Sequence, residues 1–280
     1  MVRGLPVRVL DDRDVAVVRD ILDRDPVANV FVASRVASCG VDPWRLGAEI
    51  WGYVRDGRIT ALCYSGANLV PVGADAEACE AFAEKARRQG RRCSSLVGPA
   101  QQVAWLWAAL EGDWGPARDV RPNQPLMAIS DPPRIPPDPF VRRVRPDELE
   151  LLFPACVAMF EEEVGVSPVE SDGGALYRAR VAELISQGRA FARIEDGRVV
   201  FKAEVGAATA EVCQVQGVWV EPSLRGRGLS NGGMAAVVLL AQRHIAPVVS
   251  LYVNDYNLPA RAAYKKVGFA EVGTFMSVLF

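Results

Sequence analysis

Two stretches of the chain are rich in apolar residues, and an Asp-Gly-Arg triplet interrupts each of them. Residues 51–65 have the sequence WGYVRDGRITALCYS, and residues 190–205 have the sequence AFARIEDGRVVFKAEV. Their apolar, aromatic and β-branched residues predict β-strands, and Asp-Gly predicts a tight turn between them, so each stretch is expected to form a β-hairpin. The turns begin at Asp56 and Asp196, which lie 140 residues apart in a chain of 280.

Segments with helical or strand patterning surround both hairpins in a similar order. In the first half we expect helices over 12–22, 27–36, 76–89 and 100–111, with strands over 93–97 and 125–130. In the second half we expect helices over 146–164, 174–186, 232–243 and 259–267, with strands over 211–220, 248–253 and near 276–279. The matched order predicts a tandem duplication of one α+β module.

A proline-rich segment separates the two halves. Residues 130–139 read SDPPRIPPDP, and proline fixes its own backbone and disfavours helix in the preceding residue. We therefore expect a stiff connector over 131–139 between a domain at 1–130 and a domain at 140–280. Each domain is predicted to be an αβα-layered α+β module, in which helices flank a mixed, mostly antiparallel twisted sheet.

Composition narrows the classes of protein. The net charge of −2 argues against a nucleic-acid-binding protein that relies on a broad basic field. No apolar run approaches the roughly 18 residues that a membrane span needs, and charged residues occupy the start of the chain where a signal peptide would be apolar. The six cysteines form no CxxC pair and there is one histidine, so we expect reduced thiols, no metal site and a cytoplasmic protein.

A glycine-rich turn follows the strand expected at 211–220. Residues 214–231 read QVQGVWVEPSLRGRGLSN, and an apolar helix comes directly after them. Successive backbone N–H groups at a helix N-terminus bind anions, and glycines let a phosphate approach that backbone closely. The turn lacks the GK[ST] ending of a P-loop and the acidic residue of a dinucleotide-binding fingerprint. On its own it is compatible with a phosphate site or with a plain surface turn.

A second motif distinguishes these alternatives. Residues 257–269 read NLPARAAYKKVGF. Together with VWVEPSLRGRGLS, this segment resembles the GNAT acetyltransferase superfamily. The first stretch is similar to the acetyl-CoA loop Q/R-x-x-G-x-G/A at Arg225, Gly228 and Ser230, and the second is similar to N-x-x-A-x-x-x-Y-x-x-x-G-F. The resemblance covers about 140–280, and the two halves resemble tandem actinobacterial GNAT proteins, including the mycothiol synthase type.

The resemblance implies an acetyl-CoA-dependent N-acetyltransferase that joins acetyl-CoA and an amine in a ternary complex. It implies pairing of the pantetheine arm with the backbone of Val218, Trp219 and Val220, and a cofactor contact from Asn257. The residues that it implies around the pyrophosphate are Arg225, Gly226, Arg227, Gly228, Leu229, Ser230 and Asn231. Ser230 departs from the usual glycine or alanine, but serine is small, so we expect the loop to keep its fit.

Tyr264 is, by resemblance, the general acid that protonates the leaving thiolate. The general base is harder to place, because Gln214 and Tyr252 stand where relatives carry a carboxylate. The acidic candidates are the Glu161–Glu163 run, which is also typical of a solvated face, and Glu204; within the run, Glu163 is our candidate for the base or for amine recognition. An α-amine would need little help, because about a tenth of it is neutral at pH 7, against about 0.04% for lysine. A small molecule or a peptide N-terminus would supply such an amine.

The first half lacks these motifs. Where the second half has its glycine-rich turn, the first has VPVGADAEACE, and Asp75, Glu77 and Glu80 would repel a pyrophosphate. We expect a degenerate copy with a structural or substrate-shaping role. Two alternatives stay open for the whole chain: a non-catalytic acyl-CoA-binding regulatory module, and an acyltransferase of mycothiol-synthase type. The sequence names no acceptor and leaves the oligomeric state open, a homodimer included.

Overall fold

The two Asp-Gly hairpins are present and are built alike. In a computed structural model that describes residues 6–170 and 173–280, Asp56 and Asp196 have φ of 50° and 47°, and the glycine after each also has positive φ. Both strand pairs shift register just before the turn, after Tyr53 in one hairpin and after Arg193 in the other. These shifts again lie 140 residues apart. The same turn and the same irregularity at matching positions agree with duplication of one module.

The chain divides into two compact units, and the first contains residues 1–126, 252–256 and 271–280. Its strands are β1 (Val7–Val9), β2 (Glu49–Arg55), β3 (Arg58–Ser65), β4 (Asn68–Val72), β5 (Ser95–Pro99), β12 (Ala270–Leu279) and β6 (Asp119–Ile129), in that order across the sheet. Its helices are α1 (Val15–Leu22), α2 (Val30–Cys39), α3 (Pro43–Leu46), α4 (Ala76–Gln89) and α5 (Ala100–Trp114). The last three residues of β6, 127–129, are counted in the second unit.

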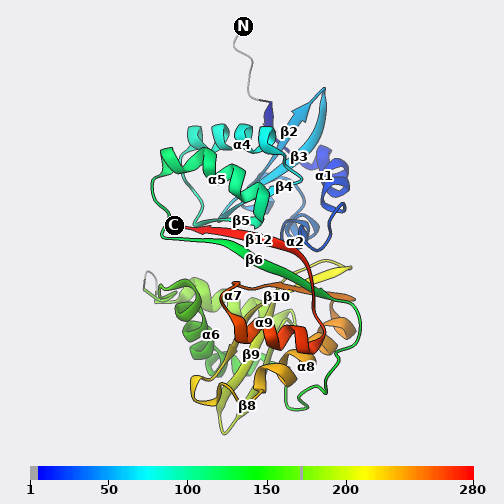
Figure 1. The fold of residues 1–280 in the computed structure, drawn as a ribbon, viewed down its shortest axis with the longest axis vertical. Helices are drawn as coiled ribbons and strands as arrows, with labels where there is room; N and C mark the ends of the chain where they lie inside the picture. The colour runs from blue at the N-terminus through cyan, green and yellow to red at the C-terminus, as the bar shows by residue number, and fades with distance from the viewer. Residues whose placement is uncertain (1–5, 171–172) are drawn as a thin grey trace. The chain divides into compact units, whose positions relative to one another are not determined.

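Alternating side chains of the first sheet pack against different helices. Trp51 and Cys63 join the apolar cluster formed with α4 and α5, whereas Ile50 and Leu62 join the cluster formed with α1 and α2. Figure 1 shows these two helix pairs on opposite faces of the sheet. These strands are therefore buried on both faces, which explains why residues 50–53 and 61–64 are continuous apolar runs.

The second unit contains residues 127–251 and 257–270. Its sheet order is β11 (Val248–Tyr252), β10 (Val212–Val220), β9 (Arg198–Ala208), β8 (Ala190–Glu195) and β7 (Arg142–Arg143). Its helices are α6 (Leu149–Val164), α7 (Ala175–Ser186), α8 (Leu229–His244) and α9 (Leu258–Val267). β10 pairs antiparallel with β9 and parallel with β11, so the sheet is mixed. The α+β class expected from the sequence is confirmed.

The proline-rich segment lies against the second unit. The Arg134 amide donates to the Val267 carbonyl at 2.8 Å, and the Asp138 amide donates to the Gly232 carbonyl at 2.9 Å. Asp138 also pairs with Arg193 at 2.7 Å. The connector is therefore held by hydrogen bonds along its length.

The last strand of the chain belongs to the sheet of the first unit. β12 pairs antiparallel with β5, from Phe275 opposite Pro99 to Leu279 opposite Ser95. The compact units therefore differ from a simple division of the sequence at residues 130 and 140, and the functional division into domains 1–130 and 140–280 stays a proposal. Residues 1–5 of the first range and 171–172 of the second lie outside the described residues.

Candidate active site

The glycine-rich turn leads into α8, which begins at Leu229, three residues before the start at 232 that the sequence pattern predicts. Gly226 and Gly228 have φ of 76° and 79°, a left-handed conformation that glycine adopts without strain, and Gly228 is the N-cap residue of α8. Leu229, Ser230 and Asn231 then form the first turn of the helix. The two glycines thus set the direction in which the backbone N–H groups of the turn point.

Five successive amides of this turn are available to a ligand. The hydrogen bonds that close the turn run from the Arg225 amide to the Pro222 carbonyl, at 3.3 Å, and from the Asn231 amide to the Gly228 carbonyl, at 3.0 Å. Between them, the amides of residues 226–230 donate no backbone hydrogen bond among the described residues. A Cβ at Gly226 would meet no atom within 4 Å, so the space over the turn is open. Such a row of donors at a helix N-terminus is suited to a phosphate.

The edge of β10 that leads into this turn is also open. Its ladder to β11 covers only Val212 to Gln214, and the next part of the strand has no parallel partner. On the other side, Gln216 pairs with Glu204 and Trp219 pairs with Lys202, so the extra residues Gly217 and Val218 form a bulge. Backbone groups of Val218–Val220 can therefore pair with an extended ligand. This is the place where the resemblance puts the pantetheine arm.

Arg225 is occupied by a partner within the protein. Its Nη2 donates to both carboxylate oxygens of Glu162, at 3.0 and 2.7 Å, and its Nε donates to the Val220 carbonyl at 3.0 Å. Trp219, 7% exposed, donates from Nε1 to the same Glu162 carboxylate at 3.2 Å. Arg227 is exposed and has no ion pair in the described part of the chain. Of the two arginines, Arg227 is the one whose charge is not already compensated.

Tyr264 lies on α9 with its side chain only 6% exposed. Its phenol makes no hydrogen bond to any described residue, and its ring packs against Phe269 with the centroids 5.9 Å apart. Burial and the nearby charge of Glu163 raise its pKa above the ordinary value. Tyr264 therefore keeps its proton at neutral pH, as a general acid must. Burial, and after it the charges of Glu204, Cys156 and Glu163, raise the pKa of Tyr177, so Glu163 acts electrostatically on both tyrosines.

A buried ion pair lies beside the bulge of β10. Lys202 is 1% exposed and donates to Glu204 at 3.2 Å, while Gln216 donates to the other oxygen of Glu204 at 2.9 Å. Burial acts to lower the pKa of Lys202, but its interactions with Glu204 and Cys156 together outweigh burial and the pKa is raised. A Cβ at Gly217 would lie 3.1 Å from both Lys202 Nζ and the Glu204 carboxyl carbon. Sequence analysis named Glu204 but missed Lys202, although the spacing of two residues along a strand puts them on one face.

Asn257 caps α9, because its side-chain oxygen accepts from the Ala260 amide at 3.2 Å. That bond uses one of the groups that the resemblance assigns to the cofactor, and the expected contact stays a prediction. Gln214 is buried, and Tyr252 stacks with Phe275 at 5.3 Å between centroids.

The corresponding helix start in the first unit is closed. The Asp75 carboxylate accepts from the Ala78 amide at 2.9 Å, and Gln102 accepts from the Ala74 amide at 3.0 Å. Arg55 pairs with Asp75 and Glu77 at 2.8 and 2.9 Å. Amides that would face a phosphate are thus satisfied internally, next to two carboxylates.

Among residues 6–170 and 173–280, no three His, Cys, Asp or Glu side chains gather as a metal site. Within the same ranges, no helix has the length and apolar character required to cross a membrane.

Comparison with known proteins finds two family matches, one in each half of the chain. Residues 158–269 match the acetyltransferase (GNAT) family, and residues 48–152 match a domain of unknown function, DUF4081. No curated protein matches the chain.

Several solved structures are similar over the full length of the chain. A Drosophila protein is 14% identical, with 99% of each chain covered and a TM-score of 0.68. An acetyltransferase of the GNAT family from Colwellia psychrerythraea is 12% identical, covering 98% of this chain and 99% of its own, with a TM-score of 0.57. A tandem GNAT protein from the clavulanic acid biosynthesis pathway is 17% identical, with 98% of each chain covered and a TM-score of 0.51. At such identities these likenesses show the fold. Residues 158–269 therefore match the acetyltransferase (GNAT) family, and the chain has the fold of a tandem GNAT protein.

Proposed function

We propose that the protein is an acetyl-CoA-dependent N-acetyltransferase with one working site, in its second half. The observation that carries the proposal is the row of unpartnered amides at residues 226–230, ahead of α8 and next to the open edge of β10. The amides and the helix dipole favour a diphosphate. The open strand edge is suited to the amide groups of a pantetheine arm. Acetyl-CoA contains both groups, with its diphosphate joined directly to its pantetheine arm.

The reaction that these residues support is a direct transfer. The neutral amine nitrogen attacks the thioester carbonyl carbon, and the C–N bond forms while an N–H of the Val218–Val220 segment donates to the developing oxyanion. The C–S bond then breaks with its electron pair on sulfur, and Tyr264 gives its proton to that sulfur. The proton released by the amine leaves through Glu163 or water, and Tyr264 is reprotonated from solvent.

We further propose that the acceptor is a primary amine that reaches the transferase site as a cation. Glu163 acts electrostatically on both Tyr264 and Tyr177, and it stands near the end of α6, so its carboxylate can attract an ammonium group there. Glu163 would orient the ammonium form before it loses its proton. A peptide N-terminus or a small α-amino compound fits the low amine pKa that a site with a weak base favours.

The test is free-thiol release from acetyl-CoA with a panel of amines, alongside calorimetry of acetyl-CoA binding. Thiol release that depends on both substrates supports the proposal, and we expect α-amines to react faster than lysine side-chain amines at pH 7. Acetyl-CoA binding without turnover on any amine would instead identify an acyl-CoA-binding regulatory module. Failure to bind acetyl-CoA would reject both functions.

A further inference from the structure

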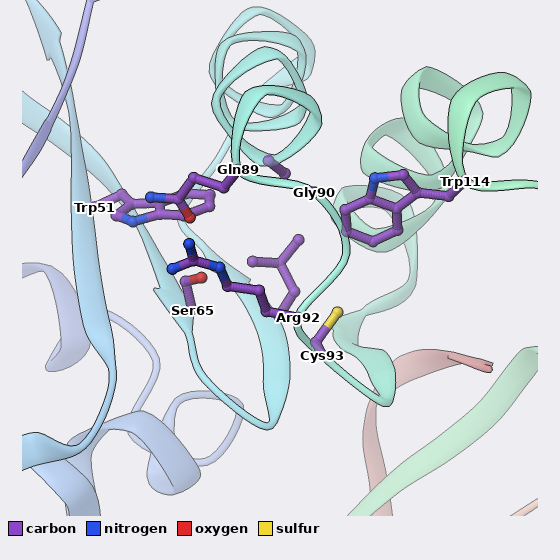
Figure 2. A pocket seen from close by; sticks show the side chains of 9 residues that line it. Trp51, Ser65, Gln89, Gly90, Arg92, Cys93 and Trp114 are labelled. Atoms are coloured by element: carbon purple, nitrogen blue, oxygen red, sulfur yellow. The ribbon is translucent and has the colours of Figure 1, made fainter.

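A groove in the first unit has no role in the transferase site, whose residues all belong to the second unit. It has a volume of about 360 Å³ and lies where α3 ends, β2 starts, β3 turns into β4 and α4 ends. Its polar lining comes from Glu49, Ser65, Gln89 and Arg92. The volume is within the range of about 300–1,000 Å³ that small-molecule sites occupy. A smaller cavity adjoins it, lined by Trp51 and Trp114 (Figure 2).

The carboxylate of Glu49 is fixed in the groove. Its Oε2 accepts from Trp51 Nε1 at 2.6 Å and from Gln89 Nε2 at 3.2 Å. Burial acts to raise the pKa of Glu49, but these two donors and the charges of Lys85 and Arg92 together lower it, so the group is ionised at neutral pH. Within the described residues, no hydrogen bond is made to Oε1. Glu49 thus offers one oriented, negatively charged acceptor.

Arg92 supplies the opposite charge. It follows α4, and within the described ranges it forms neither an ion pair within 4.0 Å nor a hydrogen bond. Figure 2 shows its guanidinium pointing toward Ser65, Gln89 and Trp51. The neighbouring Arg91 differs, because its guanidinium lies over the Phe280 ring, 4.6 Å from the centroid. An arginine fork beside a hydroxyl is suited to a carboxylate.

The two charges belong to one groove but do not neutralise each other by direct contact. Arg92 is close enough to lower the pKa of Glu49, yet no ion pair joins them in the described chain. An anion alone would be repelled by Glu49, and a cation alone would be repelled by Arg92. A ligand that carries both an ammonium and a carboxylate satisfies both groups at once.

We propose that this groove binds a small zwitterion of the free α-amino acid class. Glu49 Oε1 and the Gln89 side-chain oxygen receive the ammonium, while Arg92 and the Ser65 hydroxyl receive the carboxylate. The indole Nε1 of Trp114 in the adjoining cavity is buried without an acceptor among the described residues, so it can donate to a polar side chain of the ligand or to a water that the ligand orders. The site lies inside the segment that matches DUF4081.

The test is calorimetric titration of the full-length protein with the 20 common L-amino acids, without acetyl-CoA, so that its result is independent of the transferase proposal. At least one amino acid should bind with a Kd below about 10 mM. The N-acetyl derivative and the methyl ester of the best binder each remove one charge, and each should bind at least tenfold more weakly. The proposal would be overturned if no amino acid binds with a Kd below about 10 mM, or if either derivative binds as tightly as the best amino acid.

Variants link the binding to the groove. Arg92→Ala and Glu49→Gln should each weaken the best amino acid at least tenfold, while Arg91→Ala, the matched control on the adjacent arginine, should leave its Kd unchanged. Thermal melts of the three variants show whether the fold is kept. Unchanged affinity in folded Arg92→Ala protein would place the ligand elsewhere and reject this site.

Discussion

Nη2 of Arg225 donates to both carboxylate oxygens of Glu162, at 3.0 and 2.7 Å, and joins the glycine-rich turn to the last turn of α6. Helix α6 carries Glu163, the candidate for the base or for amine recognition, whereas the turn is expected to hold the diphosphate. The Glu162 charge therefore competes with the diphosphate for Arg225. Both side chains are nearly half exposed, so the pair is worth no more than about 1 kcal/mol.

This competition predicts that Glu162→Gln tightens acetyl-CoA binding. The variant removes a negative charge near the expected diphosphate site and releases Arg225, while its amide oxygen can still accept from Trp219. A gain below about 1 kcal/mol corresponds to a Kd lowered by up to about fivefold. Calorimetry at low salt measures it. Glu161→Gln, which changes a neighbour that pairs with Ser167, is the control and should leave Kd unchanged. A weaker Kd in Glu162→Gln would show that the pair holds the turn in its binding form instead.

Acetyl-CoA should bind once per chain. In the first unit, Asp75 and Gln102 occupy the amides that correspond to the open row at residues 226–230. Gly228→Glu should abolish binding, because a glutamate at φ of 79° is strained and its carboxylate repels a phosphate. Calorimetric stoichiometry of the wild type and the variant measures both effects. Two equivalent sites per chain would show that each half binds acetyl-CoA. A thermal melt checks that the variant is folded.

Tyr264→Phe should lower kcat by about 100-fold while the Kd of acetyl-CoA stays the same, since only the proton donor is removed. The pKa of Tyr264 is raised, so the group keeps its proton as pH rises through the neutral and mildly alkaline range. Wild-type kcat should consequently show no loss from this group between about pH 7 and pH 9. Single-turnover rates replace kcat if product release limits turnover. An unchanged chemical rate in the variant would exclude Tyr264 as the acid.

Acid should destabilise the second unit through Glu148. Arg142 donates two hydrogen bonds to this carboxylate, at 2.8 and 2.7 Å, and holds its pKa at about 2, below the ordinary value of 4.5. A lowered folded-state pKa contributes stability above the unfolded-state pKa, and that contribution is lost as pH falls from about 4.5 towards 2. The Tm of wild type should therefore fall more steeply over this range than the Tm of Glu148→Gln. Glu111→Gln, at an exposed position, is the control and should follow the wild type.

The local patterns of the sequence predicted the elements well, because each depends on neighbours in the chain. The two Asp-Gly hairpins require only flanking strand-forming residues and a turn that tolerates positive φ. The start of α8 was placed three residues late, at 232, because the pattern of apolar residues does not show that Gly228 adopts the capping conformation. The partner of β12 could not be predicted, since pairing with β5 joins residues far apart in the sequence.

Side-chain partners in the candidate site were less predictable for the same reason. The run Glu161–Glu163 is typical of a solvated face, and nothing local shows that Glu162 meets Trp219 and Arg225, which lie more than 50 residues later. Lys202 is among four lysines in the sequence, and its burial follows only from the packing of α6 over β9. The spacing of the glycines therefore identifies the row of backbone amides at residues 226–230 from sequence alone. The charged side chains around that row are harder to identify.

The buried pair of Lys202 and Glu204 gives a stability prediction with a built-in control. Lys202→Met leaves the Glu204 carboxylate buried without its cation, and breaking such a pair costs about 3–5 kcal/mol. Replacing both partners, in Lys202→Met with Glu204→Leu, removes the uncompensated charge and should restore most of the lost Tm, because two apolar side chains can fill the space under the bulge. Thermal melts of the single and double variants measure the difference. If the double variant melts no higher than Lys202→Met, the loss comes from packing around Gly217 rather than from the unpaired charge.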